Sequence, residues 1–133
     1  MRRLLLCAVV GCAYHPGSFE LGPHHTGEKR ASIDCLDIAV SREGMRIRYQ
    51  IGNRCDDPAI VDLAHVPVFG DGTILRPYDP RLELREARLD ARMTAEEMIE
   101  YRDADTPHEL CVDLASIAHA TPAQWQCWAV AKS

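Results

Sequence analysis

Apolar residues at every second position constrain the fold of this chain more than any other feature. This two-residue period is typical of a β-strand with one buried face. Two such runs follow each other: Leu36, Ile38 and Val40, then Met45, Ile47, Tyr49 and Ile51. Residues 41–44 between the runs end in a glycine, which can adopt the positive φ of a tight turn. The pattern therefore predicts a β-hairpin.

Further short strands are expected along the chain. Residues 52–58 are rich in Gly, Asn, Asp and Pro and predict a break. Residues 60–69 form an apolar run in which Pro67 indicates an edge or a bulge. Alternation returns at residues 110–115, and residues 125–130 form a last aromatic run. About seven short strands predict an all-β fold, an antiparallel sandwich of the immunoglobulin type.

Residues 81–102 fit two structures. Their Leu, Ala, Glu, Arg and Met content favours a helix, and Thr94 with Glu97 has the spacing of a capping box, which predicts a short helix near 94–102. Apolar residues nevertheless alternate in two runs with a slip between them, as a bulge would give. We favour strands at 82–92 and 98–103.

The first twelve residues have the order of a secretory leader. Arg2 and Arg3 precede an apolar run of seven residues, which is too short to span a bilayer. Val9-Val10-Gly11-Cys12 resembles the lipobox of bacterial lipoproteins. The resemblance implies that residues 1–11 are removed as a signal peptide and that Cys12 is acylated. An ordinary cleaved leader and a buried strand of a cytosolic domain are the alternatives.

The resemblance also implies an address. Ala13 follows the cysteine where an aspartate would often signal inner-membrane retention, so the outer membrane is expected. Residues 12–31 are interpreted as the lipidated cysteine and a flexible tether, and residues 32–131 as the sandwich domain. Residues 51–63 look like a segment of uncharacterised bacterial lipoproteins that carry one small β-sandwich, which implies a fold but no reaction.

Four cysteines remain beyond Cys12, and an even number in a small exported domain predicts two disulfides. A final hairpin would place Cys111 opposite Cys127, so this pair is favoured. Cys35 and Cys55 flank the first hairpin and are the second predicted pair, although an ideal turn leaves them out of register. The main rival pairing is Cys35–Cys111. The wide spacing disfavours a four-cysteine zinc site.

Charge and motifs exclude several functions. Removing the leader takes away Arg2 and Arg3, which changes the formal net charge from −5 to −7, so a nucleic-acid partner is not expected. The sequence contains no nucleophile elbow, phosphate-binding loop or dinucleotide fingerprint. We therefore expect neither an enzyme nor a cofactor, and we interpret the chain as a binding or structural accessory module of the cell envelope.

Several residues are candidates for a site. His15, His24 and His25 could bind copper or zinc within the tether, which makes metal handling an alternative function. Dispersed carboxylates could serve a small hydrolase, which is a further alternative. Trp128 is the candidate for a partner surface, because it differs in parity from Trp125 and one of the two should point outward. The remaining candidates are the Asp56–Asp57 turn and three histidines that occur singly, His65, His108 and His119. The partner and the oligomeric state stay open.

Overall fold

The computed structural model describes residue 14 and residues 28–102 and 106–130. These residues form ten strands and one short 3₁₀ helix, η1. The strands are β1 (Lys29–Ile33), β2 (Leu36–Glu43), β3 (Arg46–Asn53), β4 (Ala59–Val61), β5 (Val68–Gly70), β6 (Thr73–Pro77), β7 (Ala87–Leu89), β8 (Thr94–Arg102), β9 (Glu109–Asp113) and β10 (Trp125–Ala129), and η1 spans Leu114–Ala118. The described residues contain no helix long and apolar enough to cross a membrane.

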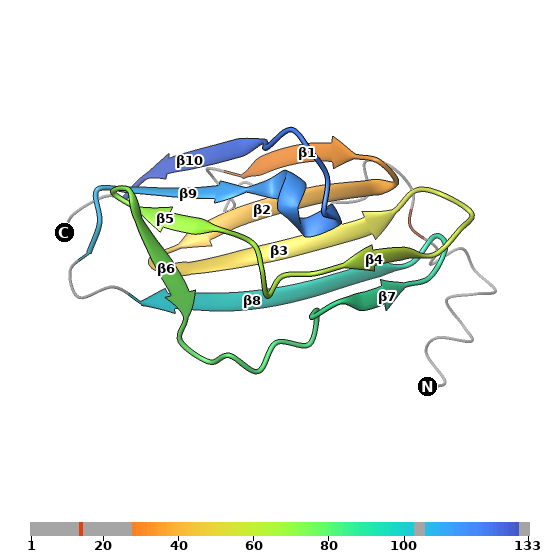
Figure 1. Cartoon of the computed structure of the whole chain (residues 1–133), viewed down its shortest axis with the longest axis horizontal. Helices are drawn as coiled ribbons and strands as arrows, with labels where there is room; N and C mark the ends of the chain where they lie inside the picture. Colours follow the sequence, from red (N-terminus) through yellow and green to blue (C-terminus); the bar gives the residue numbers. More distant parts are fainter. Residues whose placement is uncertain (1–13, 15–27, 103–105, 131–133) are drawn as a thin grey trace.

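Eight of the strands form one antiparallel sheet in the order β1-β2-β3-β8-β6-β5-β9-β10. The sheet folds over at its middle, where β6 and β8 share only two residue pairs. It therefore makes two layers, β1-β2-β3-β8 and β6-β5-β9-β10, with η1 and the separate β4-β7 ribbon beside them (Figure 1). The expected all-β, antiparallel, sandwich-like fold is confirmed.

Residues 94–102 form a strand instead of a short helix. They pair with β3, and Ala95, Glu97, Ile99 and Tyr101 share the inward side of β8. The carboxylate of Glu97 does not cap a helix, because it accepts hydrogen bonds from the backbone N–H groups of Glu83 and Leu84, both at 2.9 Å. Of the strand expected at 82–92, only β7 forms.

The ordered body begins before the expected boundary at residue 32. Strand β1 starts at Lys29 and pairs with β2 along its whole length. Tyr14 is buried as well, with 2% of its surface exposed. Parts of the segment interpreted as a tether therefore belong to the folded body.

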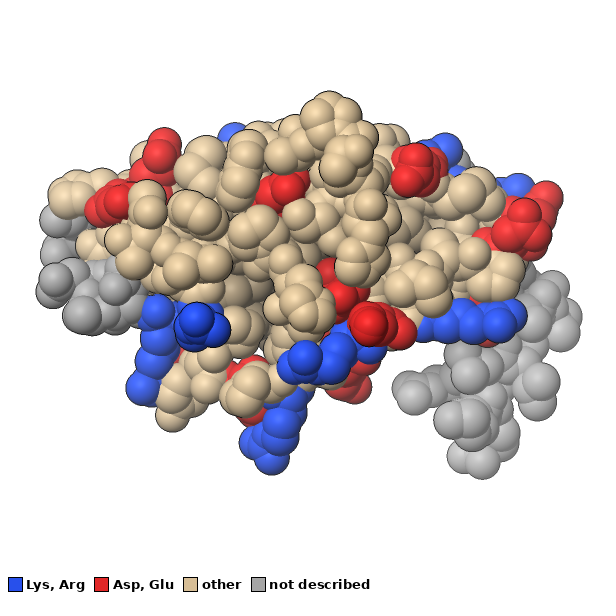
Figure 2. Space-filling model, viewed as in Figure 1, with Lys and Arg blue, Asp and Glu red and all other residues tan. Residues whose placement is uncertain are grey.

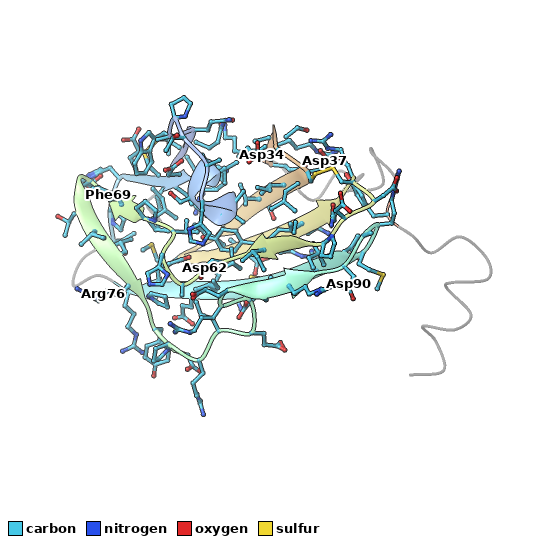
Figure 3. All side chains as sticks on the ribbon, turned by 45° about the vertical axis from the view of Figure 1, so that its right-hand side comes forward. Asp34, Asp37, Asp62, Phe69, Arg76 and Asp90 are labelled. Carbon is cyan, nitrogen blue, oxygen red and sulfur yellow. A yellow bond between two sulfur atoms is a disulfide. The ribbon has the colours of Figure 1, made fainter. Side chains whose placement is uncertain are left out.

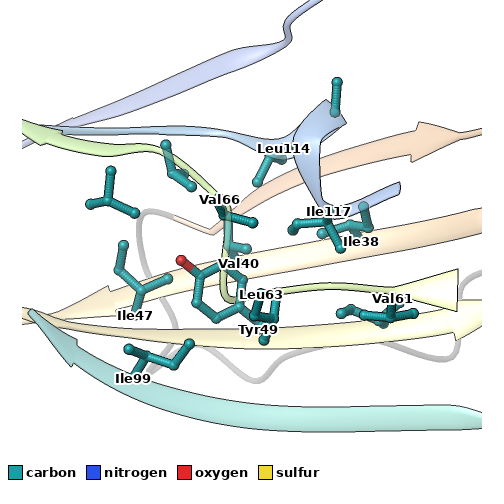
Figure 4. Packing of buried hydrophobic residues seen from close by; sticks show 14 of the residues in the cluster. Ile38, Val40, Ile47, Tyr49, Val61, Leu63, Val66, Ile99, Leu114 and Ile117 are labelled. Atoms are coloured by element: carbon teal, nitrogen blue, oxygen red, sulfur yellow. The ribbon is translucent and has the colours of Figure 1, made fainter. Parts of the chain in front are cut away.

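The core lies between the two layers and is filled by the alternating apolar residues of the strands (Figure 4). Ile47, Tyr49 and Ile51 of β3 are fully buried, as their spacing predicted. The hydroxyl oxygens of Tyr49 and Tyr101 lie 2.6 Å apart inside this core, so each polar group has a partner. Burial raises the pKa of both tyrosines.

The favoured disulfide Cys111–Cys127 and the second predicted pair Cys35–Cys55 are both present, and the rival pairing Cys35–Cys111 is not formed. Cys35–Cys55 lies just beyond the last residue pair between β2 and β3, and Cys111 and Cys127 stand directly opposite each other on β9 and β10. A bridge closing a loop of this size stabilises a domain by about 3 kcal/mol. Two disulfides favour an oxidising, exported environment.

Candidate functional site

The two tryptophans of β10 point to opposite sides of the sheet, but the exposed one is not the one that was expected. Trp128 pairs with Leu110 and is 6% exposed, so it belongs to the core. Trp125 is 45% exposed. The prediction of Trp128 as a partner surface is therefore wrong, and its neighbour Trp125 is the exposed aromatic residue.

Trp125 belongs to an apolar surface that we call the apolar sheet face. It consists of Phe69, Ile74, Trp125 and the Cys111–Cys127 disulfide. Phe69 is paired across the strands with Ile74 on one side and with Cys111 on the other. Cys111 is paired in turn with Cys127. The ring of Trp125 meets that of Phe69 edge to face, with centroids 5.5 Å apart. Ile74 is more than half exposed.

Charged side chains border this face, and the Glu109 carboxylate lies within 4.8 Å of its disulfide sulfurs. Glu109 lies two residues from Cys111 on the same side of β9, and Arg76 lies two residues from Ile74 on β6. In the space-filling view, most Lys and Arg gather along the lower margin, while the upper part of the molecule is mainly tan with separate Asp and Glu groups (Figure 2). The apolar sheet face thus suits an uncharged, apolar contact.

A second group joins a buried carboxylate to two exposed imidazoles. Asp62, which follows β4, is 0% exposed, and its Oδ2 lies 2.8 Å from His65 Nδ1 and 3.5 Å from His119 Nε2 (Figure 3). Its Oδ1 accepts a hydrogen bond from the backbone N–H of Ala64. Burial raises the pKa of Asp62, but hydrogen bonds from His65 and from the backbone of Ala64 and Glu86 outweigh it and leave the pKa lowered.

This group brings together residues that are far apart in the sequence. His119 has a left-handed backbone, with φ of 53°, at the end of η1, and this conformation turns its ring toward Asp62. Asp62 is hydrogen-bonded to the ring of His65, while the ring of His119 lies nearby. A histidine oriented by a carboxylate is suited to proton transfer. In the sequence, the spacing of Asp62 and His65 is the only local pattern that indicates this group.

The remaining candidates have structural roles or fall outside the described residues. His108 lies 3.3 Å from Asp71, whose carboxylate also holds the backbone before β9. Asp56 pairs with Arg92 at 3.1 Å in the turn that was expected there. Among the described residues, one group could gather three metal ligands, Glu109 with Cys111 and Cys127, but its sulfurs are joined to each other. His15, His24 and His25 lie outside the described residues.

A cavity of about 250 Å³ opens beside β8, between Tyr78 and Met98. Several of its charged lining residues already have partners. Arg81 pairs with Asp79 at 3.0 Å, and Glu97 holds two backbone N–H groups. We therefore do not assign a ligand to it.

Comparison of the chain with models of known families, with curated proteins and with solved structures finds no match.

Proposed function

We propose that this chain is an exported, lipid-anchored module of the cell envelope that binds a partner protein through the apolar sheet face. The lipobox-like order at residues 9–12 supports the anchor, and Ala13 supports an outer-membrane address. The two disulfides agree with export, because such bonds persist in oxidising compartments.

The apolar sheet face is the observation that carries the binding role. Exposed apolar patches on small proteins mark interaction sites, and tryptophan is prominent among residues that dominate binding energy. The occupant is a protein with an apolar surface of its own. A nucleic acid or an anionic lipid headgroup would need clustered basic side chains, and this face is formed by Phe69, Ile74, Trp125 and a disulfide.

Site-specific photo-crosslinking in cell envelopes tests this role. A photoreactive residue at position 125 should give one discrete adduct, which the purified domain suppresses by competition. The same residue at Tyr78, which is similarly exposed on a loop, is the matched control and should not give that adduct. The partner identified in this way is then titrated against the purified domain.

In that titration, Trp125→Ala should weaken binding at least tenfold, while Tyr78→Ala should leave the affinity unchanged. Equal adducts at both positions, or equal affinities of the two variants, would contradict the proposed binding face.

A second candidate function, hydrolysis, is favoured by the contact between Asp62 and His65. A histidine oriented by a buried carboxylate can act as a general base toward water. A screen of ester and amide substrates would then show activity that is lost in both Asp62→Asn and His65→Ala and kept in His108→Ala. Activity that survives in the Asp62 and His65 variants would exclude this role.

A further inference from the structure

Tyr14 is held on the folded body by contacts to two different segments. Its backbone N–H donates to the carbonyl oxygen of Arg92 at 2.6 Å, just before β8. Its hydroxyl donates to Oδ2 of Asp37 on β2 at 2.5 Å. Because both ends of this nearly buried residue are hydrogen-bonded, Tyr14 has a defined place on the body.

Gly52 supplies the space that the Tyr14 ring occupies. A Cβ at position 52 would lie 2.6 Å from two ring carbons of Tyr14, much closer than atoms can approach. Gly52 is the last residue of β3 that is paired on both sides, with Asp37 of β2 and Thr94 of β8, and a glycine weakens a strand. Its φ is not in the left-handed region. The close approach of the Tyr14 ring therefore explains why a glycine is found there.

The receiving site is held by a disulfide and by polar contacts. The Cys35–Cys55 disulfide ties the ends of β2 and β3 together beside it. Asp37 is also fixed by Ser32, whose hydroxyl donates at 2.7 Å, and by Arg54, at 2.6 Å. We call this site, formed by Asp37, Gly52 and the Arg92 carbonyl, the Tyr14 dock.

The Tyr14 dock lies on the side of the sandwich opposite the apolar sheet face. Gly52 follows the fully buried Ile51, so it points to the outer side of the β1-β2-β3-β8 layer. The apolar sheet face is the outer side of the other layer. Asp37 and Phe69 also lie toward opposite ends of the molecule (Figure 3).

We infer that the Tyr14 dock holds the lipid anchor close to the domain. The Cys35–Cys55 end then lies on the membrane, and the apolar sheet face points away from the membrane. This inference rests on the proposed acylation of Cys12. Tyr14 is two positions after Cys12, and an extended chain spans at most about 7 Å over that length. A free tether of residues 12–31 would instead allow an average distance of about 25 Å.

The test uses the full acylated chain in vesicles of phosphatidylethanolamine and phosphatidylglycerol. A fluorescent amino acid is placed at Asp57, near the Cys35–Cys55 end, or at Ile74, on the apolar sheet face. Energy transfer to a headgroup dye should be strong from position 57 and weak from position 74. In the Gly52→Ala chain, which keeps the leader unchanged, the two positions should differ much less.

Two controls complete the experiment. Tyr78→Ala should keep the difference between the two labels, and the disulfides and circular dichroism of each variant report its folding. Equal energy transfer from positions 57 and 74 in the acylated wild-type chain would overturn the inference and leave the lipid anchor intact. Mass spectrometry that finds Cys12 unmodified would overturn the anchor itself, and the orientation with it.

Discussion

Because Gly52 and Tyr14 are in contact, the effect of Gly52→Ala on the free energy of unfolding should change sign when Tyr14 is removed. Gly52→Ala in the wild-type chain places a methyl group 2.6 Å from the Tyr14 ring. The ring must move, which disturbs the hydrogen bond from its hydroxyl to Asp37. Overpacking of this kind costs about 1–3 kcal/mol, so we expect the free energy of unfolding to fall by about 2 kcal/mol.

The same substitution should act in the opposite direction once Tyr14 is removed. In the Tyr14→Ala chain the space above Gly52 is empty, and alanine is better than glycine in a strand by about 0.5–1 kcal/mol. Gly52→Ala should therefore stabilise that chain slightly. The coupling energy between the two positions is then about 2–3 kcal/mol, which is large for a single pair.

Urea unfolding of the four chains under oxidising conditions measures this coupling. The leader is omitted from all four, so that only the folded body is compared. If Gly52→Ala lowers the free energy of unfolding equally with and without Tyr14, the ring does not occupy the dock. The steric explanation for Gly52 is then wrong.

Three further predictions concern the folded body. Asn53 is buried and its side-chain amide donates to the carbonyl oxygens of Asp57, Leu89 and Asp90, so Asn53→Ala should lower the free energy of unfolding by about 3 kcal/mol. The control Gln50→Ala, on the exposed side of β3, should change the free energy of unfolding by less than about 0.5 kcal/mol. Equal urea midpoints of the two variants would refute this prediction. Replacing both Cys111 and Cys127 by serine should cost about 3 kcal/mol in the same assay, and an unchanged midpoint would show that the bridge is not formed. The lowered pKa of Asp62 means that its ionised form stabilises the fold above the ordinary value of 3.8, and this contribution is lost as the pH falls through the folded value. Acid titration of Asp62→Asn should therefore show a shallower loss of stability below pH 4 than wild type, and identical acid profiles would contradict the assignment.

The strands could be predicted because their buried face leaves a direct trace in the sequence. The alternation around Ile47 and Tyr49 follows from the pleat of one strand and needs no partner. In residues 94–102, helix propensity and alternation point to different structures. Pairing of β8 with β3 decides the outcome, since tertiary contacts override local propensity.

The sites depend on distant parts of the chain and could not be predicted in the same way. Parity alone shows that Trp125 and Trp128 face opposite sides, but the register with β9 determines which one is buried. The approach of the His119 ring to Asp62 depends on the turn after η1, which local sequence patterns do not reveal. Tyr14 lies in a Gly- and Pro-containing segment without a period, and Gly52 was interpreted as part of a break although it lies inside β3.

Intact-mass and peptide mass spectrometry of the protein isolated from membranes tests the acylation of Cys12 and both disulfides in one experiment. We predict a chain that begins at Cys12, carries acyl groups there, and yields linked peptides for Cys35–Cys55 and Cys111–Cys127. A chain that begins at Met1, without acyl groups and with free thiols at these four cysteines, would contradict the account.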